Sequence, residues 1–163
     1  ASLDYEPNQD GILWFLDTVY PLLIKEDPEI KLYIVGKNPS DKIKKYHSEK
    51  IVVTGTVDFV KKYYELASVC IVPLRSGGGT RLKILEALAY GIPNVSTTIG
   101  CEGISVVNGK TILIADSPED FANGIKRLMQ DKQLWFDISK NGRELVEDMY
   151  VWDKIALKYS EVI

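Results

Sequence analysis

The segment Val69–Ser96 constrains the fold of this chain more than any other stretch. It opens with a short apolar run, Val69–Val72, which is typical of a strand buried on both faces, and Pro73 ends that run. Ser76–Thr80 follows as a glycine-rich loop, whose backbone can adopt angles that are closed to other residues. Arg81–Tyr90 is then expected to form a helix. A strand that leads through a glycine loop into a helix N-terminus is typical of a phosphate-binding site.

The start of this helix adds candidate ligand-binding groups. Thr80 is a candidate N-cap, and Arg81 and Lys83 place positive charge in the first turn, where it opposes the helix dipole and indicates an anionic ligand. Because side chains lean toward the helix N-terminus, Arg81 is expected to project over the loop. Glu86 lies one turn further along and can accept hydrogen bonds from sugar hydroxyls. The expected apolar face consists of Ile84, Leu85, Leu88 and Ala89.

Composition excludes several classes of protein. The chain has 163 residues, enough for one domain with a substantial core, and its net charge of −3 gives no general affinity for nucleic acid. No apolar run reaches the roughly 20 residues of a membrane span. Cys70 and Cys101 do not make a disulfide framework, so we expect a reducing, cytoplasmic setting. With His47 as the single histidine, we expect neither a metal site nor a Ser-His-Asp triad.

Apolar strands alternate with amphipathic helices along the chain, which predicts an α/β fold with a Rossmann-like parallel sheet covered by helices on both faces. The expected strands are 31–35, 51–54, 69–72, 93–97 and 111–115. The expected helices are 8–26, 40–46, 58–67, 81–90, one that starts at Ser117, 132–149 and 152–162. Asn8 and Asp58 are the expected N-caps of the first and third of these, and a bend is expected at Pro21. The helix that starts at Ser117 is expected to bury Phe121, Ile125, Leu128 and Met129. A doubly wound unit opens with a strand, and residues 1–3 are too short for one. We therefore expect that most of the first strand belongs to a longer protein.

The run Pro73–Ala87, P-L-R-S-G-G-G-T-R-L-K-I-L-E-A, resembles retaining glycosyltransferases of family 4, also called group 1. Their GT-B fold has two Rossmann-like domains, of which the C-terminal one binds the nucleotide-sugar donor and the N-terminal one binds the acceptor. The resemblance covers essentially the whole chain, 1–163, and only that C-terminal domain. Further matching pieces are Tyr5-Glu6-Pro7-Asn8, Ile34-Val35-Gly36, Val53-Thr54-Gly55, Ala89-Tyr90-Gly91-Ile92-Pro93 and Tyr150-Val151-Trp152.

The resemblance implies roles for individual residues. Glu86 matches a glutamate that holds the ribose hydroxyls, and Val57 lies where the base rests. Arg81, with Lys83 or Arg75 as alternatives, is expected to replace the paired basic residues that the family carries after its first strand. The diphosphate cradle matches Gly77, Gly78, Gly79 and Thr80, with the amides of Arg81 and Leu82. No metal and no cofactor are implied, and the substrate is a nucleoside diphosphate sugar.

One position departs from the family pattern. The family motif is a glutamate, seven residues and a second glutamate, and Gly78 stands where the first of these is expected before Glu86. The glutamate near the donor sugar is therefore absent. This departure leaves open whether the chain is catalytic.

Three functions remain open. The resemblance implies that this chain is the donor-binding domain of an enzyme that transfers a sugar to an unknown acceptor in surface glycan synthesis. It also implies that the full-length protein is cytoplasmic or peripheral at the inner membrane face. The isolated domain is expected to be inactive. A nucleotide-sugar 2-epimerase shares the fold but needs acidic and histidine groups that we cannot place. A non-catalytic module that binds a nucleotide or a partner is the third, and turnover by the full-length protein separates it from the first. Two structural alternatives also stand: the glycine run as a flexible turn, and Arg81 and Lys83 as surface ion pairs.

Overall fold

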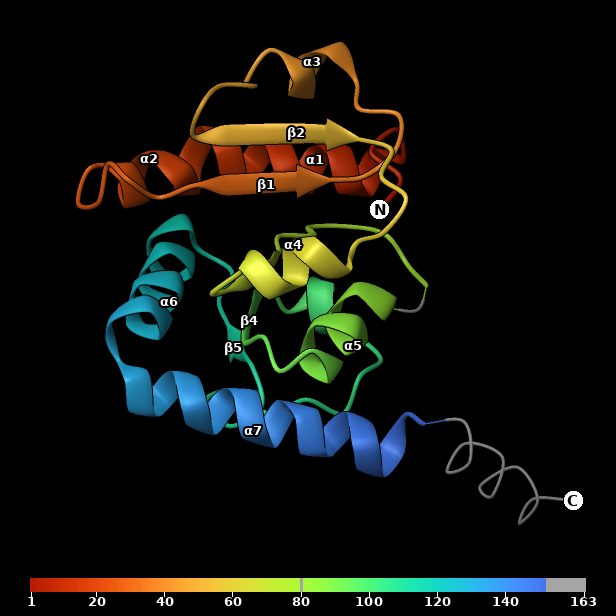
Figure 1. Ribbon diagram of the computed structural model, residues 1–163, viewed down its shortest axis with the longest axis vertical. Helices are drawn as coiled ribbons and strands as arrows, with labels where there is room; N and C mark the ends of the chain where they lie inside the picture. The colour runs from red at the N-terminus through yellow and green to blue at the C-terminus, as the bar shows by residue number, and fades with distance from the viewer. Residues whose placement is uncertain (80, 152–163) are drawn as a thin grey trace, which may run out of the picture.

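The chain alternates helices and strands throughout, as seen in a computed structural model that describes residues 1–79 and 81–151 (Figure 1). The strands are β1 (Leu32–Val35), β2 (Ile51–Gly55), β3 (Cys70–Val72), β4 (Asn94–Ser96) and β5 (Leu113–Ile114). The helices are α1 (Glu6–Trp14), the π-helix η1 (Phe15–Val19), α2 (Tyr20–Ile24), α3 (Asp41–Lys44), α4 (Lys61–Leu66), α5 (Leu82–Ala89), the 3₁₀-helix η2 (Ile99–Cys101), α6 (Pro118–Gln130) and α7 (Lys132–Met149). The predicted α/β class is confirmed. The predicted helix 152–162 lies outside the described residues.

All the named strand pairs are parallel, but they form two sheets instead of the single predicted sheet. β1 pairs with β2, and β4 lies between β3 and β5. Residues 1–3 lie beside the end of β1, where Ser2 forms an isolated parallel bridge with Lys37 and the Leu3 amide donates to the Lys37 carbonyl at 2.8 Å. A single bridge is too short to continue the β1 ladder toward β3. This explains why the two sheets stay separate in the described part of the chain.

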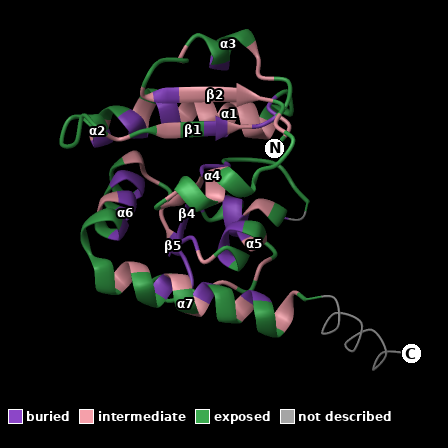
Figure 2. Ribbon diagram, in the orientation of Figure 1, coloured by how far each residue is buried: buried purple, intermediate pink, exposed green. Residues whose placement is uncertain are grey.

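Helices cover both sheets and bury their apolar faces against them. One core cluster joins the α1–α2 region to α6, and Phe121 is its centre, with its ring at right angles to Trp14 and 5.6 Å away. A second cluster fills the space between α5, the ends of β3 and α7. In Figure 2 the buried residues of α5, α6 and α7 lie on the sides that face the interior of the domain, while most of α4 is exposed. The helix α4 is therefore attached to the domain by few side chains.

The first predicted helix is one continuous rod with an irregular middle. Pro21 has no amide to donate, and the residues just before it, Phe15–Val19, form a π-helix. The predicted bend at Pro21 stays a prediction. The prediction of Asn8 as N-cap was wrong. The helix starts at Glu6 with Tyr5 as the cap residue, and the Asn8 side chain makes long-range contacts instead.

Later helix ends follow the sequence signals unevenly. Ser117 caps α6 as predicted and accepts a hydrogen bond from the Asp120 amide at 3.1 Å. Asp58 does not cap α4, which begins only at Lys61 and has no side-chain cap. Two buried-face predictions were also wrong. Ala89 in α5 is exposed, with Ala87 buried in its place, and Met129 in α6 is 42% exposed.

The glycine loop uses its glycines unequally. Gly77 and Gly79 both have a φ of 96°, in the left-handed region that favours glycine. A Cβ atom added at Gly77 would also lie 2.9 Å from the ring of Pro7 at the start of α1. At Gly78 an added Cβ would meet no atom of the described residues within 4 Å, and φ lies outside the left-handed region. The loop conformation therefore requires glycine at 77 but not at 78.

We predict that Gly77→Ala lowers the free energy of unfolding by about 1–2 kcal/mol through its left-handed φ alone, with the Pro7 contact adding to the loss. Gly78→Ala is the matched control one residue away and is expected to leave stability unchanged or slightly raised. Thermal unfolding followed by circular dichroism measures both variants. Equal melting temperatures for the two would contradict the assigned loop conformation.

Candidate functional site

The predicted site lies where α1, the glycine loop and α5 meet. The arrowheads of β1 and β2 point to the side of the molecule on which α5 begins (Figure 1). Helix α1 packs directly on the chain that enters the loop, since a Cβ atom added at Gly11 would lie 2.4 Å from the Pro73 carbonyl oxygen. Arg75 at the start of the loop forms an ion pair with Asp10 of α1 at 3.1 Å. The loop is therefore held against the first helix as well as between β3 and α5.

Arg81 holds the glycine loop from the inside. It is the N-cap residue of α5, one position before the helix rather than inside the first turn as predicted, and it is only 5% exposed. Its Nη2 donates to the Gly77 carbonyl at 2.7 Å and its Nη1 donates to the Gly78 carbonyl at 3.2 Å. The buried Nε has no partner among the described residues. Thr80, the predicted N-cap, lies outside the described residues.

These two contacts set the direction of the loop amides. In a trans peptide the carbonyl and the following amide point in opposite directions. Because the carbonyls of Gly77 and Gly78 point toward Arg81, the amides of Gly78 and Gly79 point away from it. The loop is exposed, so these amides can reach a ligand.

A second cation lies beside the loop. The half-buried Lys83 donates through Nζ to Asn8 Oδ1 of α1 at 2.8 Å, and burial lowers the pKa of Lys83, with the charge of Arg81 adding to the effect. Within residues 1–79 and 81–151, neither Arg81 nor Lys83 has a carboxylate within 4 Å. Within this described part of the chain, the alternative that Arg81 and Lys83 form ion pairs with surface acids was wrong. Arg75, in contrast, is neutralised by Asp10.

Glu86 lies one turn after Lys83 on α5 and is exposed. Its Oε2 accepts a hydrogen bond of 3.1 Å from the hydroxyl of Tyr64 on α4. The Tyr64 ring stacks on Tyr90, with centroids 5.0 Å apart and planes at 16°. Burial raises the pKa of Tyr64, and the thiol of Cys70 and the carboxylate of Glu86 raise it further, so the hydroxyl stays protonated and donates. Glu86 is thus held by a neighbouring helix.

Val57 lies apart from the loop, just after β2. It lines a surface pocket of about 330 Å³ together with Thr56, Asp58 and Phe59, which lead into α4, and Lys62 in the first turn of that helix. Helix α4 therefore connects this pocket at one end to Tyr64, which contacts Glu86. Its place after the carboxyl end of a parallel strand is where open α/β sheets bind ligands.

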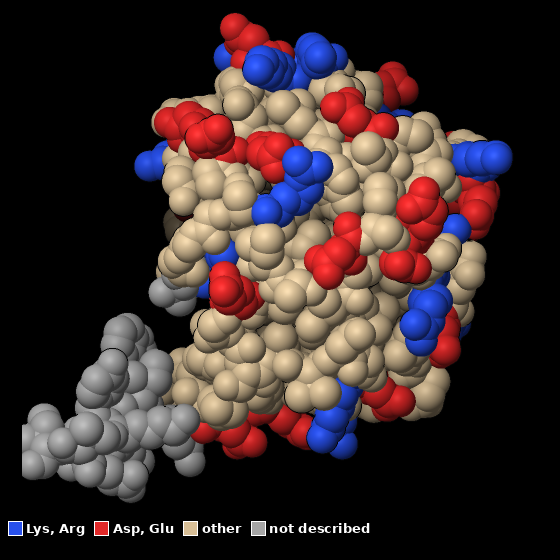
Figure 3. Space-filling view, turned by 180° about the vertical axis from the view of Figure 1, so that it is seen from behind, with Lys and Arg blue, Asp and Glu red and all other residues tan. Residues whose placement is uncertain are grey.

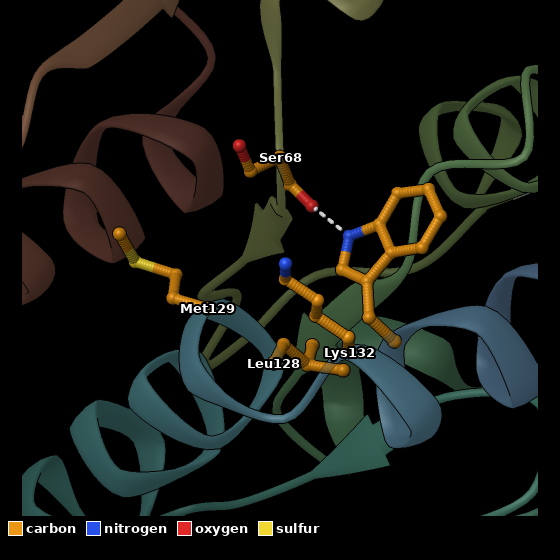
Figure 4. Close-up of a pocket in the computed structure, with 5 residues that line it drawn as sticks. Ser68, Leu128, Met129 and Lys132 are labelled. Atoms are coloured by element: carbon orange, nitrogen blue, oxygen red, sulfur yellow. Dashed lines mark hydrogen bonds between the residues drawn. The ribbon is translucent and has the colours of Figure 1, made fainter.

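Another pocket, of about 230 Å³, lies at the opposite end of β3 (Figure 4). Trp135 of α7 borders it and donates through Nε1 to the Ser68 carbonyl at 2.7 Å. Leu128, Met129 and Lys132 complete its lining. Because Ser68 precedes β3 and the glycine loop follows it, this pocket is separate from the predicted site.

Gly77, Gly78, Arg81 and Lys83 are brought together as predicted from the sequence, and Leu82 is exposed at the first turn of α5. Asn8 and Tyr64 were missed as site residues. Asn8 belongs to Tyr5-Glu6-Pro7-Asn8, a piece that matches the family, so the sequence did contain a signal for its place in the site. Tyr64 has no local signal, since its contact with Glu86 spans 22 residues.

Three further observations concern surface charge, membrane-spanning helices and metal-ligating groups. Figure 3 shows acidic and basic side chains interspersed over the face opposite that of Figure 1. Within the described residues, none of the helices combines the length and the apolar character that a membrane crossing requires. No group of three or more potential metal-ligating side chains was found there either.

The comparison with protein families gives a match over most of the chain. The family described as "Glycosyl transferases group 1" matches residues 1–131. A Klebsiella pneumoniae protein described as "Uncharacterized 44.6 kDa protein in cps region" is 29% identical over 157 residues, which cover 91% of this chain and 40% of that protein. The chain therefore spans less than half the length of this relative.

Solved structures agree on the fold. The C-terminal domain of a group 1 glycosyltransferase, LpcC from Francisella tularensis, superposes with a TM-score of 0.74 at 20% identity, covering 87% of this chain and 80% of that one. Anabaena Alr3699/HepE, solved in complex with UDP and glucose, gives a TM-score of 0.80 at 16% identity over 99% of this chain and 46% of its own. The chain thus belongs to the group 1 glycosyltransferases and has the fold of a GT-B C-terminal domain.

Proposed function

We propose that this chain binds the nucleoside diphosphate sugar donor of a retaining glycosyltransferase. The observation that carries the proposal is the positive charge of Arg81 and Lys83, which no described carboxylate compensates, beside a loop whose amides point outward. An anionic diphosphate satisfies both features. HepE, which has the same fold, was solved with UDP and glucose. Transfer itself requires an acceptor-binding part, so this chain alone is expected to bind without turnover.

The chemistry follows from charge. During transfer, the bond between the anomeric carbon and the diphosphate oxygen breaks and its electron pair passes to the diphosphate. In this proposal the amides of Gly78 and Gly79 and the N-terminus of α5 stabilise this charge, and Arg81 supplies positive charge from behind the loop. The acceptor oxygen bonds to the anomeric carbon on the same face of the sugar, and the hydroxyl proton passes to the departing diphosphate. In this proposal Arg81 also fixes the amides, and the chemistry needs no metal or other cofactor.

The ribose and the base have candidate partners on α5 and after β2. The exposed carboxylate of Glu86 accepts hydrogen bonds from the ribose hydroxyls, and Val57 contacts the base in the pocket that leads into α4.

A role in surface glycan synthesis is the corresponding proposal for the whole protein. The Klebsiella relative, described as a protein in a cps region, supports it.

Gly78 favours one alternative. It stands where the family carries a glutamate near the donor sugar, and among the described residues no atom lies within 4 Å of where its Cβ would be. A domain that binds a nucleotide without chemistry would also show this pattern. Turnover of a nucleotide sugar by the full-length protein would exclude that alternative.

We predict that this chain binds at least one of UDP, GDP and ADP, and that adding Mg²⁺ does not change its affinity. The loop amides and the two cations neutralise the diphosphate without a metal. Isothermal titration calorimetry with each nucleotide, with and without Mg²⁺, measures this. Absence of binding to all three would contradict the proposed function, and strict dependence on Mg²⁺ would contradict its metal independence.

Glu86→Ala is expected to weaken binding of that nucleotide by about tenfold or more, because hydrogen bonds to a charged group contribute roughly 1.5–3 kcal/mol. Glu144→Ala, which removes an exposed glutamate from α7, is the control and should leave the dissociation constant unchanged. Titration of both variants decides the matter. Similar affinities for Glu86→Ala and wild type would remove Glu86 from the site.

Arg81→Ala is expected to weaken binding of the nucleoside diphosphate at least tenfold while changing binding of the nucleoside little, since both its charge and its hold on the loop carbonyls are lost. Arg75→Ala also removes an arginine from the loop segment, but one that Asp10 neutralises, and should have a smaller effect. The measurement is the ratio of the two dissociation constants for each variant. An equal loss for nucleoside and diphosphate would argue against a role toward the phosphates.

A further inference from the structure

A hydrogen bond between two helices fixes the carboxylate of the candidate ribose-binding residue. The Tyr64 hydroxyl on α4 donates to Glu86 Oε2 on α5 at 3.1 Å. Tyr64 is itself held by its stack on Tyr90 at the end of α5. Both contacts link α4 to α5, although α4 has six residues and no buried side chain of its own.

The chemistry of a carboxylate makes this contact more than packing. An ionised carboxylate only accepts hydrogen bonds, and each oxygen carries two lone pairs. A glutamate side chain on an exposed helix face turns freely, and fixing it on ligand binding loses conformational entropy. A donor that occupies one lone pair of Oε2 orients the group in advance. It leaves Oε1 and the second lone pair of Oε2 for the two hydroxyls of a ribose.

The surroundings keep Tyr64 a donor. Burial raises the pKa of Tyr64, and Cys70 and Glu86 raise it further, so the hydroxyl keeps its proton and can donate a hydrogen bond. The stacked ring of Tyr90 restricts where the hydroxyl can lie. The donor is thus preorganised on both counts.

We infer that Tyr64 is a positioning residue for the ribose of the bound nucleotide, acting through Glu86. The inference rests on the proposed function, because it requires a ribose at Glu86. Helix α4 then has two roles toward one ligand, since the residues leading into it line the pocket of Val57 and its middle orients Glu86. The base and the ribose are recognised by groups tied to one short element.

The test uses the intact chain and compares ribose with a sugar that lacks both hydroxyls. Tyr64→Phe keeps the ring and its stack and removes the donor alone. For whichever of UDP, GDP and ADP binds, its affinity should fall about three- to tenfold, and affinity for the 2′,3′-dideoxy form should not change. Tyr63→Phe is the matched control on the same helix, where the ring packs against Tyr33, and should change neither affinity.

A double-mutant cycle separates positioning from damage to the fold. In a Glu86→Ala background, Tyr64→Phe should have no further effect on the ribose-to-dideoxy ratio of dissociation constants. An equal loss for both nucleotides, or a further loss without Glu86, would overturn the inference while leaving the proposed function intact. Failure of the wild-type chain to bind any of the three nucleotides would overturn both.

Discussion

The contact on which the site depends is that of a buried guanidinium with two successive carbonyl groups of the glycine loop. Glycine-rich backbone loses more conformational entropy on ordering than any other, so such a loop needs a strong partner to adopt one shape. Arg81 supplies it with donors to the carbonyls of Gly77 and Gly78. The planarity of the peptide then turns the amides of Gly78 and Gly79 outward. One side chain thereby both orders the loop and determines which of its polar groups face a ligand.

This arrangement explains why α1 matters to a site built mainly by β3 and α5. The left-handed Gly77 lies against Pro7, Lys83 donates to Asn8, and Arg75 is neutralised by Asp10. Each contact joins the first helix to the loop or to the start of α5. Because Arg75 is paired and Arg81 and Lys83 are not paired within the described residues, the positive charge is concentrated at the N-terminus of α5. An anion there gains from the cations and the helix dipole together.

The sequence was a good guide to most features set by local interactions, with the cap predicted at Asp58 as an exception. Apolar runs located all five strands, and the Ser117 signal located the start of α6, because burial and capping depend on neighbours in the chain. It failed where a distant partner decides. Asn8 does not cap the helix as predicted and instead accepts a hydrogen bond from Lys83. The residues around Tyr64 give no indication of its hydrogen bond to Glu86. The single predicted sheet became two because residues 1–3 form only one described bridge beside β1.

The same contacts indicate how the proposed donor is divided over the chain. In the proposed function, the amides, the helix dipole and the cations bind the diphosphate, while Glu86 and the pocket after β2 bind the nucleoside. Gly78 offers the sugar no side chain, and no atom of the described residues lies within 4 Å of where its Cβ would be. Binding energy is therefore concentrated on the part of the donor that leaves. An enzyme built this way recognises its leaving group tightly and takes its choice of sugar from groups other than residue 78.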